Sequence, residues 1–173
     1  LLPNYAASKI ALLQKKYPSK DALIGTLDTF LIFKLTNGKS FVTEHSMAAR
    51  TQLYELIEQH WSSELCSLFS VELNRLATIE SSTPKDIIAG ELPLLAFLGD
   101  AQAALLNAVN SADGAVLNLG SIASVIVCTG SSPKFIPGFA TSVLKHDSIA
   151  PSFILEGITN ACGAVIDYLI KDL

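Results

Sequence analysis

The spacing of hydrophobic residues in the first part of the chain predicts two helices. Residues 8–17 carry apolar side chains at helical intervals, and the run ends before Pro18. Residues 25–35 form a second amphipathic segment, with Thr26 as its predicted N-cap and the turn Asn37-Gly38 after it. Both segments therefore have a helical period together with residues that stop a helix.

The pattern between residues 41 and 84 is less regular. Residues 41–43 predict a short strand, and residues 61–69 predict a third helix. Residues 44–54 show little periodicity and many small or polar side chains, which predicts a loop that crosses a functional face or an interface. Residues 81–84 read SSTP, which is typical of a loop.

An apolar run at residues 92–98 ends at the pair Gly99-Asp100. The run predicts a buried strand, and the Ala-rich residues 101–106 predict a helix packed closely on its neighbours. The carboxylate of Asp100 would then lie at the carboxyl end of a strand, where open α/β sheets bind their ligands. A charge there costs several kcal/mol unless it has a partner or holds a substrate. The alternative is that Asp100 only caps the helix that begins at Ala101.

Strand patterns dominate after residue 110. Residues 115–119 and 124–128 predict a hairpin whose tip contains Gly120 and Ser121. Residues 152–155 predict a third strand, followed by a helix that Asn160 can cap. Its predicted apolar face consists of Ala164, Val165, Tyr168 and Leu169.

This order of elements predicts an α/β protein built from parts of two domains. Three strands followed by a helix are the opening β-β-β-α of a ribonuclease H-like unit, and the region before residue 110 has the character of the closing half of another. We therefore expect a first domain over residues 1–109 and the start of a second over residues 110–173.

Composition excludes several functional classes. Of the 173 residues, 50% are hydrophobic and 16% are charged, so we expect a substantial core. The net charge is −4 and the 12 basic residues are scattered, which gives no electrostatic footprint for nucleic acid or anionic lipid. No apolar run is long enough to span a membrane. The start of the chain lacks the pattern of a signal peptide, and both ends have the character of cuts through a longer chain.

The metal-binding residue types are few and scattered. Cys66, Cys128 and Cys162 are far apart in apolar surroundings, which predicts buried, reduced thiols in a cytoplasmic protein. The three histidines lack the spacing of metal ligands, so we expect no protein-held metal site.

Three segments resemble motifs of one enzyme family. Residues 25–38, GTLDTFLIFKLTNG, are similar to G-T-I/V-D-T/S-W-L-I/L-W-K-L-T-x-G, and residues 42–51, VTEHSMAART, are similar to V-T-D-x-S-N-A-S-R-T. Residues 99–105, GDAQAAL, are similar to G-D-Q-Q-A-A-L. These motifs, in this order, are those of the FGGY carbohydrate kinases, glycerol kinases above all. The resemblance spans nearly the whole chain but only the central portion of such an enzyme.

The resemblance implies an actin-like, two-domain ribonuclease H fold that binds ATP and a sugar in the cleft between its domains. It implies transfer of the γ-phosphoryl group of ATP, with Mg²⁺, to a hydroxyl of a polyol or sugar. Asp100 matches the family's catalytic base, which takes the proton of the attacking hydroxyl. The 173-residue chain alone is then expected to be inactive, because it lacks the amino-terminal phosphate loop and most of the second domain.

The resemblance also suggests nucleotide-binding residues. Gly120 and Ser121 match the Gly-Thr of a family hairpin whose hydroxyl and amides meet the phosphates of ATP. The family's next glycine is Ile122 here, and a plain hairpin connection remains the alternative. Gly163 matches a helix glycine close to the nucleotide, although close helix–strand packing explains a glycine there almost as well.

Two positions depart from the glycerol kinase pattern. Ala101 replaces a glutamine that contacts glycerol, and Asn4 stands where a tyrosine stacks on the substrate when Lys9 is aligned with the family's lysine; Tyr5 is the alternative. Loss of the glutamine should cost a glycerol site about 1–3 kcal/mol. A different or larger substrate is therefore expected, and residues 116–121 and 99–102 also resemble sedoheptulokinase.

Two further readings stay open from the sequence. A non-catalytic sensor of sugar or nucleotide could use the same fold, as the departures at Ala101 and Ile122 suggest. A structural or interaction fragment is the third reading. Homo-oligomers are common in the family, but no residue in this sequence demonstrates one.

Overall fold

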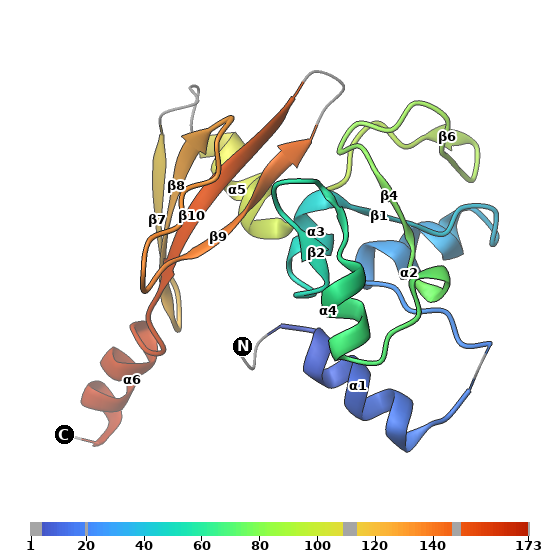
Figure 1. Cartoon of the computed structure of the whole chain (residues 1–173). Coiled ribbons are helices and arrows are strands. Elements are labelled where there is room, and N and C mark those ends of the chain that lie inside the picture. The colour runs from blue at the N-terminus through green and yellow to red at the C-terminus, as the bar shows by residue number, and fades with distance from the viewer. Residues whose placement is uncertain (1–4, 20, 109–113, 147–149, 173) are drawn as a thin grey trace. The chain divides into compact units, whose positions relative to one another are not determined.

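The structure is a computed structural model that describes residues 5–19, 21–108, 114–146 and 150–172. The chain forms two compact units (Figure 1). The first contains residues up to Gly99 and the short return Lys145–Ala150, and the second contains Asp100–Leu144 and Pro151–Leu173. The protein is therefore a mixed α/β chain, as the sequence predicts.

The first unit combines short helices with two-stranded sheets. Its helices are α1 (Ala7–Lys16), α2 (Leu27–Leu35), α3 (His45–Ala49), α4 (Ser63–Leu68) and the 3-10 turn η1 (Leu73–Arg75). Its strands are β1 (Val42–Glu44), β2 (Tyr54–Glu55), β3 (His60–Trp61), β4 (Thr78–Glu80), β5 (Ile88–Ala89) and β6 (Leu92–Pro93). The strands pair as β1–β4 in parallel and as β2–β3 and β5–β6 antiparallel.

The predicted helices at residues 8–17 and 25–35 are confirmed as α1 and α2. Thr26 precedes α2 in an extended conformation and forms a capping box with Thr29, as its N-cap role requires. The core beneath α1 consists of buried Ala7, Leu53, Cys66 and Val71. Burial raises the pKa of the Cys66 thiol. None of the three cysteines, all of which lie in the described ranges, forms a disulfide; Cys128 and Cys162 are only half-buried, so the expectation of buried thiols holds for Cys66 alone.

The prediction of a loop over residues 44–54 is wrong. These residues contain the five-residue helix α3 and the start of β2. The carboxylate of Glu44 caps α3 by accepting the Ser46 N–H. His45, Ser46 and Ala48 are all buried, so this helix has no exposed face that would give the sequence a helical period. The predicted helix at residues 61–69 is shorter, since its N-cap is Ser62 and it ends at Leu68.

The prediction of a buried strand over residues 92–98 is also wrong. Only Leu92 and Pro93 are in a strand, and Leu92 and Leu95 are 72% and 76% exposed. Residues 94–99 belong to no helix or strand. Asp100 therefore does not follow a strand but is the first residue of helix α5. An apolar run cannot form a sheet without a partner strand, and the partner of β6 is the two-residue β5.

The second unit is a four-stranded sheet with two helices. Its elements are α5 (Asp100–Ala108), β7 (Ala115–Leu119), β8 (Ala123–Gly130), β9 (Ala140–His146), β10 (Pro151–Ile158) and α6 (Gly163–Asp172). The sheet order is β7-β8-β10-β9, and the β7–β8 hairpin is antiparallel with Leu119 opposite Ala123. The hairpin prediction is confirmed.

Strand β9 is absent from the sequence prediction, which places no strand between residues 128 and 152. Its sequence, ATSVLKH, mixes apolar and polar residues without a long β-rich run. Helix α5 covers the sheet, since Leu105 packs with Ile126, Leu144 and Ile154. Gln102 is buried beside it and donates from Nε2 to the carbonyl of Val143 at 3.1 Å. This motif glutamine therefore holds α5 against β9.

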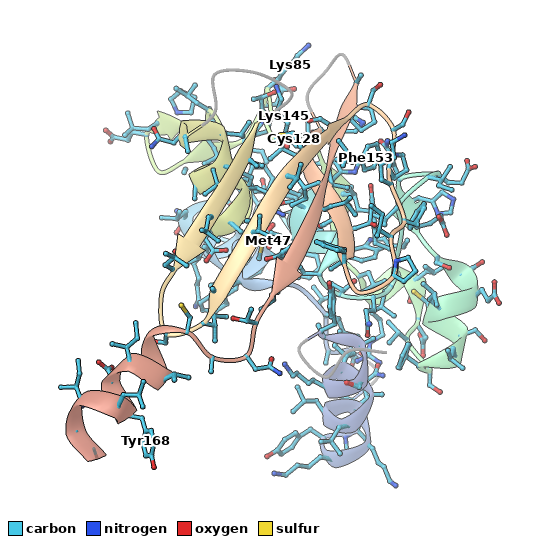
Figure 2. All side chains as sticks on the ribbon, turned by 90° about the vertical axis from the view of Figure 1, so that its left-hand side faces the viewer. Met47, Lys85, Cys128, Lys145, Phe153 and Tyr168 are labelled. Atoms are coloured by element: carbon cyan, nitrogen blue, oxygen red, sulfur yellow. The ribbon has the colours of Figure 1, made fainter. Side chains whose placement is uncertain are left out.

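Helix α6 begins at Gly163, three residues after the predicted cap Asn160. Its predicted apolar face is exposed, with Val165, Tyr168 and Leu169 each open to solvent. Figure 1 shows α6 extending away from the lower end of the sheet, and Figure 2 shows Tyr168 pointing away from it. Among the described residues, no helix has both the length and the apolar character needed to cross a membrane.

Candidate functional site

Asp100 is exposed at the amino-terminal end of α5. Its Oδ1 accepts the N–H of the next residue, Ala101, at 2.8 Å. Its Oδ2 makes no hydrogen bond within the described part of the chain. One carboxylate oxygen is thus held by the helix and the other is available to a ligand.

Ala101 is half-buried and packs against the apolar cluster around Leu105. Its methyl group therefore contributes to the contact between α5 and the sheet and supplies no hydrogen bond. Asn4, the other position compared with substrate contacts, lies outside the described residues. Tyr5, the alternative to Asn4, is half-buried before α1.

The residues just before Asp100 are held by a buried polar cluster that sequence reasoning did not identify. Glu44 is 0% exposed, and its Oε1 accepts the hydroxyl of Ser82 at 2.7 Å. Its Oε2 accepts the N–H of Ser46 at 2.7 Å and the hydroxyl of the same residue. The Ser46 hydroxyl in turn accepts the N–H of Gly99 at 3.0 Å. The only signal in the sequence is a carboxylate directly after a short strand.

Burial controls the ionisation of this cluster. It raises the pKa of Glu44, although hydrogen bonds from Ser46 and Ser82 act in the opposite direction. Beside it, the ring of His45 stacks on His146 with centroids 4.1 Å apart, and His45 Nδ1 lies 2.7 Å from the Tyr54 hydroxyl. Burial, and then the neighbouring His146, lowers the pKa of His45 to about 4.

The predicted nucleotide-binding residues meet at the tip of the β7–β8 hairpin. The N–H of Gly163 donates to the carbonyl of Gly120 at 2.9 Å, and the N–H of Cys162 donates to the carbonyl of Ser121 at 2.9 Å. A Cβ at Gly163 would lie 2.8 Å from the Gly120 carbonyl oxygen. Close packing of α6 on the tip therefore accounts for glycine at this position.

The tip leaves few polar groups for a ligand. The first amides of α6 already donate to the tip carbonyls, so the start of this helix is not open to an anion. Within the described residues, the Ser121 hydroxyl and N–H have no hydrogen-bond partner, and both are exposed. Ser121 therefore offers the tip's side-chain donor to a phosphate group.

The structure brings Gly120, Ser121 and Gly163 together. The tip lies at the lower end of the sheet, next to α6 (Figure 1). No hydrogen bond joins Asp100 to the tip in the described part of the chain.

The family motif at residues 25–38 has a structural role in the first unit. Asp28 Oδ2 accepts the Thr43 hydroxyl and the Glu44 N–H, both at 3.0 Å, and Oδ1 accepts the Thr26 hydroxyl. These bonds join the start of α2 to β1. Thr26 and Thr43 also line a pocket of about 320 Å³, but both hydroxyls already donate to Asp28.

The donor set does not form a metal site. No group of three or more His, Cys, Asp or Glu residues within the described ranges lies close enough together to hold a metal ion. Mg²⁺ therefore has no such ligand set in this part of the chain.

Comparison with known proteins identifies the relatives of the chain. Residues 1–106 match the FGGY family of carbohydrate kinases, N-terminal domain. The glycerol kinase of Mycoplasma genitalium is 35% identical over 96% of this chain and 37% of its own length. The glycerol kinase of Trichodesmium erythraeum is 32% identical over 87% of this chain and 32% of its own length.

Solved structures share the fold. The Plasmodium falciparum glycerol kinase with ADP superposes with a TM-score of 0.84 at 24% identity, over 95% of this chain and 36% of that chain. The ligand-bound xylulose kinase of Lactobacillus acidophilus has a TM-score of 0.74 at 19% identity, over 96% of this chain and 36% of that chain. The chain thus spans a little over a third of these relatives, and it belongs to the FGGY family of carbohydrate kinases, with a glycerol kinase-like sequence.

Proposed function

We propose that this chain is part of an enzyme that transfers the γ-phosphoryl group of ATP to a hydroxyl of a polyol or sugar. Asp100 is its general base. The observation that carries the proposal is the free Oδ2 of an exposed carboxylate at the start of α5, within a motif of the family. The glycerol kinase relatives support the reaction class.

Phosphoryl transfer to a hydroxyl needs a carboxylate with one oxygen free to accept a proton. A hydroxyl attacks phosphorus more readily when a base accepts its proton as the bond to phosphorus forms. Because Ala101 holds Oδ1, the carboxylate has a defined orientation, and Oδ2 takes the proton. The product is a phosphate ester and ADP.

The hairpin tip is the proposed nucleotide contact. Ser121 donates its hydroxyl and N–H to phosphate oxygens, while Gly120 and Gly163 keep the tip and α6 close enough to form a rigid support. ATP supplies the phosphoryl group that is transferred, and Mg²⁺ would arrive as its counter-ion. The bulky side chain of Ile122, next to Ser121, leaves less room for the phosphates of ATP at the tip.

We further propose the domain assignment expected from the sequence. Residues 1–109 are the later part of the sugar-binding domain and residues 110–173 begin the nucleotide-binding domain, in a ribonuclease H-like pair. The match of the family's N-terminal domain to residues 1–106 supports this division. In the described structure, however, α5 packs with the sheet that follows it.

A ketose is the second candidate substrate, and Ala101 favours it. Glycerol kinases carry a glutamine at this position, whereas the methyl group of Ala101 is turned to the apolar cluster and offers no hydrogen bond. A substrate that does not need this contact, such as sedoheptulose or another ketose, fits the change.

The test is Asp100→Asn in the full-length enzyme. We expect kcat to fall by roughly 10²–10⁴-fold, because the amide cannot accept the proton, while the affinities for ATP and sugar stay close to wild type. ADP release against a panel of polyols and ketoses measures turnover, and calorimetry measures binding. Asp21→Asn, an exposed aspartate, is the matched control.

Two outcomes would contradict the proposal. Turnover near the wild-type rate in Asp100→Asn would show that Asp100 is not the general base. Binding of a sugar or ATP by the wild-type enzyme without ADP release from any acceptor in the panel would make the protein a sensor.

A further inference from the structure

The buried carboxylate of Glu44 has a role that helix capping does not explain. It is 0% exposed, and it makes no ion pair within the described residues. Burial of a charge without a counter-ion is costly, so the hydrogen bonds around it must do more than fill a gap in the core. One oxygen, Oε2, caps α3 through the Ser46 N–H. The other, Oε1, reaches Ser82, 38 positions further along the chain.

The carboxylate fixes the direction of two hydroxyl hydrogen bonds. An ionised carboxylate only accepts, so the hydroxyls of Ser46 and Ser82 must both donate to Glu44. Each hydroxyl oxygen is then left as an acceptor for a backbone N–H. Ser46 Oγ accepts from Gly99 at 3.0 Å, and Ser82 Oγ accepts from His146 at 2.9 Å.

The Ser46 acceptor holds a segment that has no secondary structure of its own. Residues 94–99 have no strand partner to fix their backbone. The N–H of Gly99, the residue directly before Asp100, donates to Ser46 Oγ, the hydroxyl that Glu44 orients. The N–H of Phe97 donates to the backbone carbonyl of Ser82 at 3.0 Å, a bond that does not pass through the Ser82 hydroxyl.

We propose that Glu44 is a positioning residue for Asp100: through the hydroxyl of Ser46 it fixes the backbone at Gly99, and so the orientation in which the Asp100 carboxylate meets the substrate hydroxyl. This inference rests on the proposed function of Asp100 as the base. It adds a group that touches no substrate and that acts through a defined chain of hydrogen bonds.

Glu44→Gln in the full-length enzyme tests the inference. The amide can donate as well as accept, so it no longer forces both serine hydroxyls to point at residue 44. We expect faster hydrogen exchange at the amide of Gly99 and a fall in kcat of about 100-fold, with the KM for ATP unchanged. Glu58→Gln, at an exposed glutamate, is the matched control.

Ser46→Ala is the second variant, for the case in which Glu44→Gln does not fold. It removes the acceptor of the Gly99 N–H while keeping the Ser46 N–H bond to Glu44, and we expect the same faster exchange at Gly99 and the same loss of kcat. A lowered melting temperature with wild-type kcat and wild-type exchange at Gly99 in the folded variants would show a purely structural cluster and overturn the inference.

A double-mutant cycle with Asp100→Asn separates this inference from the proposed function. If Glu44 acts through Asp100, Glu44→Gln adds no further loss of kcat once Asp100 is Asn. Additive losses would overturn the inference and leave Asp100 as the base. Wild-type turnover in Asp100→Asn alone would instead refute the proposed function, whatever Glu44→Gln does.

Discussion

The His45 imidazole lies among aromatic groups that keep it neutral. Its ring is parallel to that of His146 within 18°, and the Tyr54 ring meets it edge-on. Burial raises the pKa of Tyr54, with the nearby Glu44 and Glu55 as further causes, so the phenol stays protonated. A proton on His45 would place a positive charge against His146 without solvent, which is why its pKa is depressed.

Acid should therefore destabilise the protein through His45. Its pKa is 6.5 in the unfolded chain and about 4 in the fold, so between these values the unfolded state binds more protons and stability falls as pH falls. The loss is at most about 3 kcal/mol by pH 4. Urea denaturation between pH 7 and 4 should show wild type losing more free energy of unfolding than His45→Gln.

His60→Gln, at an exposed histidine, should follow the wild-type curve. The raised pKa of Glu44 has the opposite effect on the free energy of unfolding, because the stability that this group contributes is lost as pH rises through its folded pKa. Wild type and His45→Gln both contain Glu44, so its contribution cancels when the two are compared. Parallel curves for wild type and His45→Gln would show that His45 is not the responsible group.

The contact between α6 and the hairpin tip depends on a close backbone approach. Helix α6 starts where the N–H groups of Cys162 and Gly163 donate to the tip carbonyls, and the Gly163 Cα faces the Gly120 carbonyl. The hydrophobic pattern of α6 does not indicate this contact with the tip, because the apolar face that the pattern describes is exposed to solvent. Backbone geometry therefore sets the position of the start of α6.

Gly163→Ala should disrupt the contact between the start of α6 and the hairpin tip. The added Cβ would lie 2.8 Å from the Gly120 carbonyl oxygen, so the helix start must shift, at a cost of about 1–3 kcal/mol. Urea denaturation should show the loss, and ATP affinity of the full-length enzyme should fall with it. Gly120→Ala is the informative comparison, because its Cβ would meet only the Ile122 carbonyl at 3.5 Å. Equal stability of Gly163→Ala and wild type would contradict the packing argument.

Elements with local signals were the predictable ones. Helix α2 has a capping threonine before it and the turn Asn37-Gly38 after it, and the β7–β8 hairpin has two β-rich runs around a short tip, so both are found from the sequence. Helix α3 is buried almost all round, and strand β9 lacks a β-rich run. Residues 94–99 are apolar, yet their conformation depends on bonds to serines that lie far away in the sequence.

The same distinction applies to the candidate site. Asp100 and the residues of the tip stand in motifs that a resemblance can match, and the structure brings Gly120, Ser121 and Gly163 together. The Glu44 cluster could not be predicted in this way, because its hydrogen bonds are distant in sequence. Glu44 and Ser82 are separated by 38 positions, and Ser46 and Gly99 by 53 positions. The motif at residues 25–38 identified the family although its aspartate, Asp28, joins α2 to β1.

At the scale of the whole molecule, the proposed reaction needs more groups than this chain supplies. The chain covers 37% of the Mycoplasma genitalium glycerol kinase and 36% of the Plasmodium falciparum enzyme. Among the described residues, the hydroxyl of Ser121 is the side-chain donor that the tip offers, and no cluster of ligands holds a metal ion. Positioning of ATP against Asp100 requires contacts on several sides of the nucleotide.

The 173-residue chain by itself should therefore have no kinase activity. ADP release with ATP, Mg²⁺ and each member of a polyol and ketose panel should equal that of the Asp100→Asn chain, while the full-length enzyme turns over at least one acceptor. Circular dichroism of both 173-residue chains verifies that they are folded, so that inactivity reports missing groups. Acceptor-dependent ADP release by the short chain that Asp100→Asn abolishes would mean that these residues contain a complete phosphoryl-transfer site, and the division of the site over a longer enzyme would be wrong.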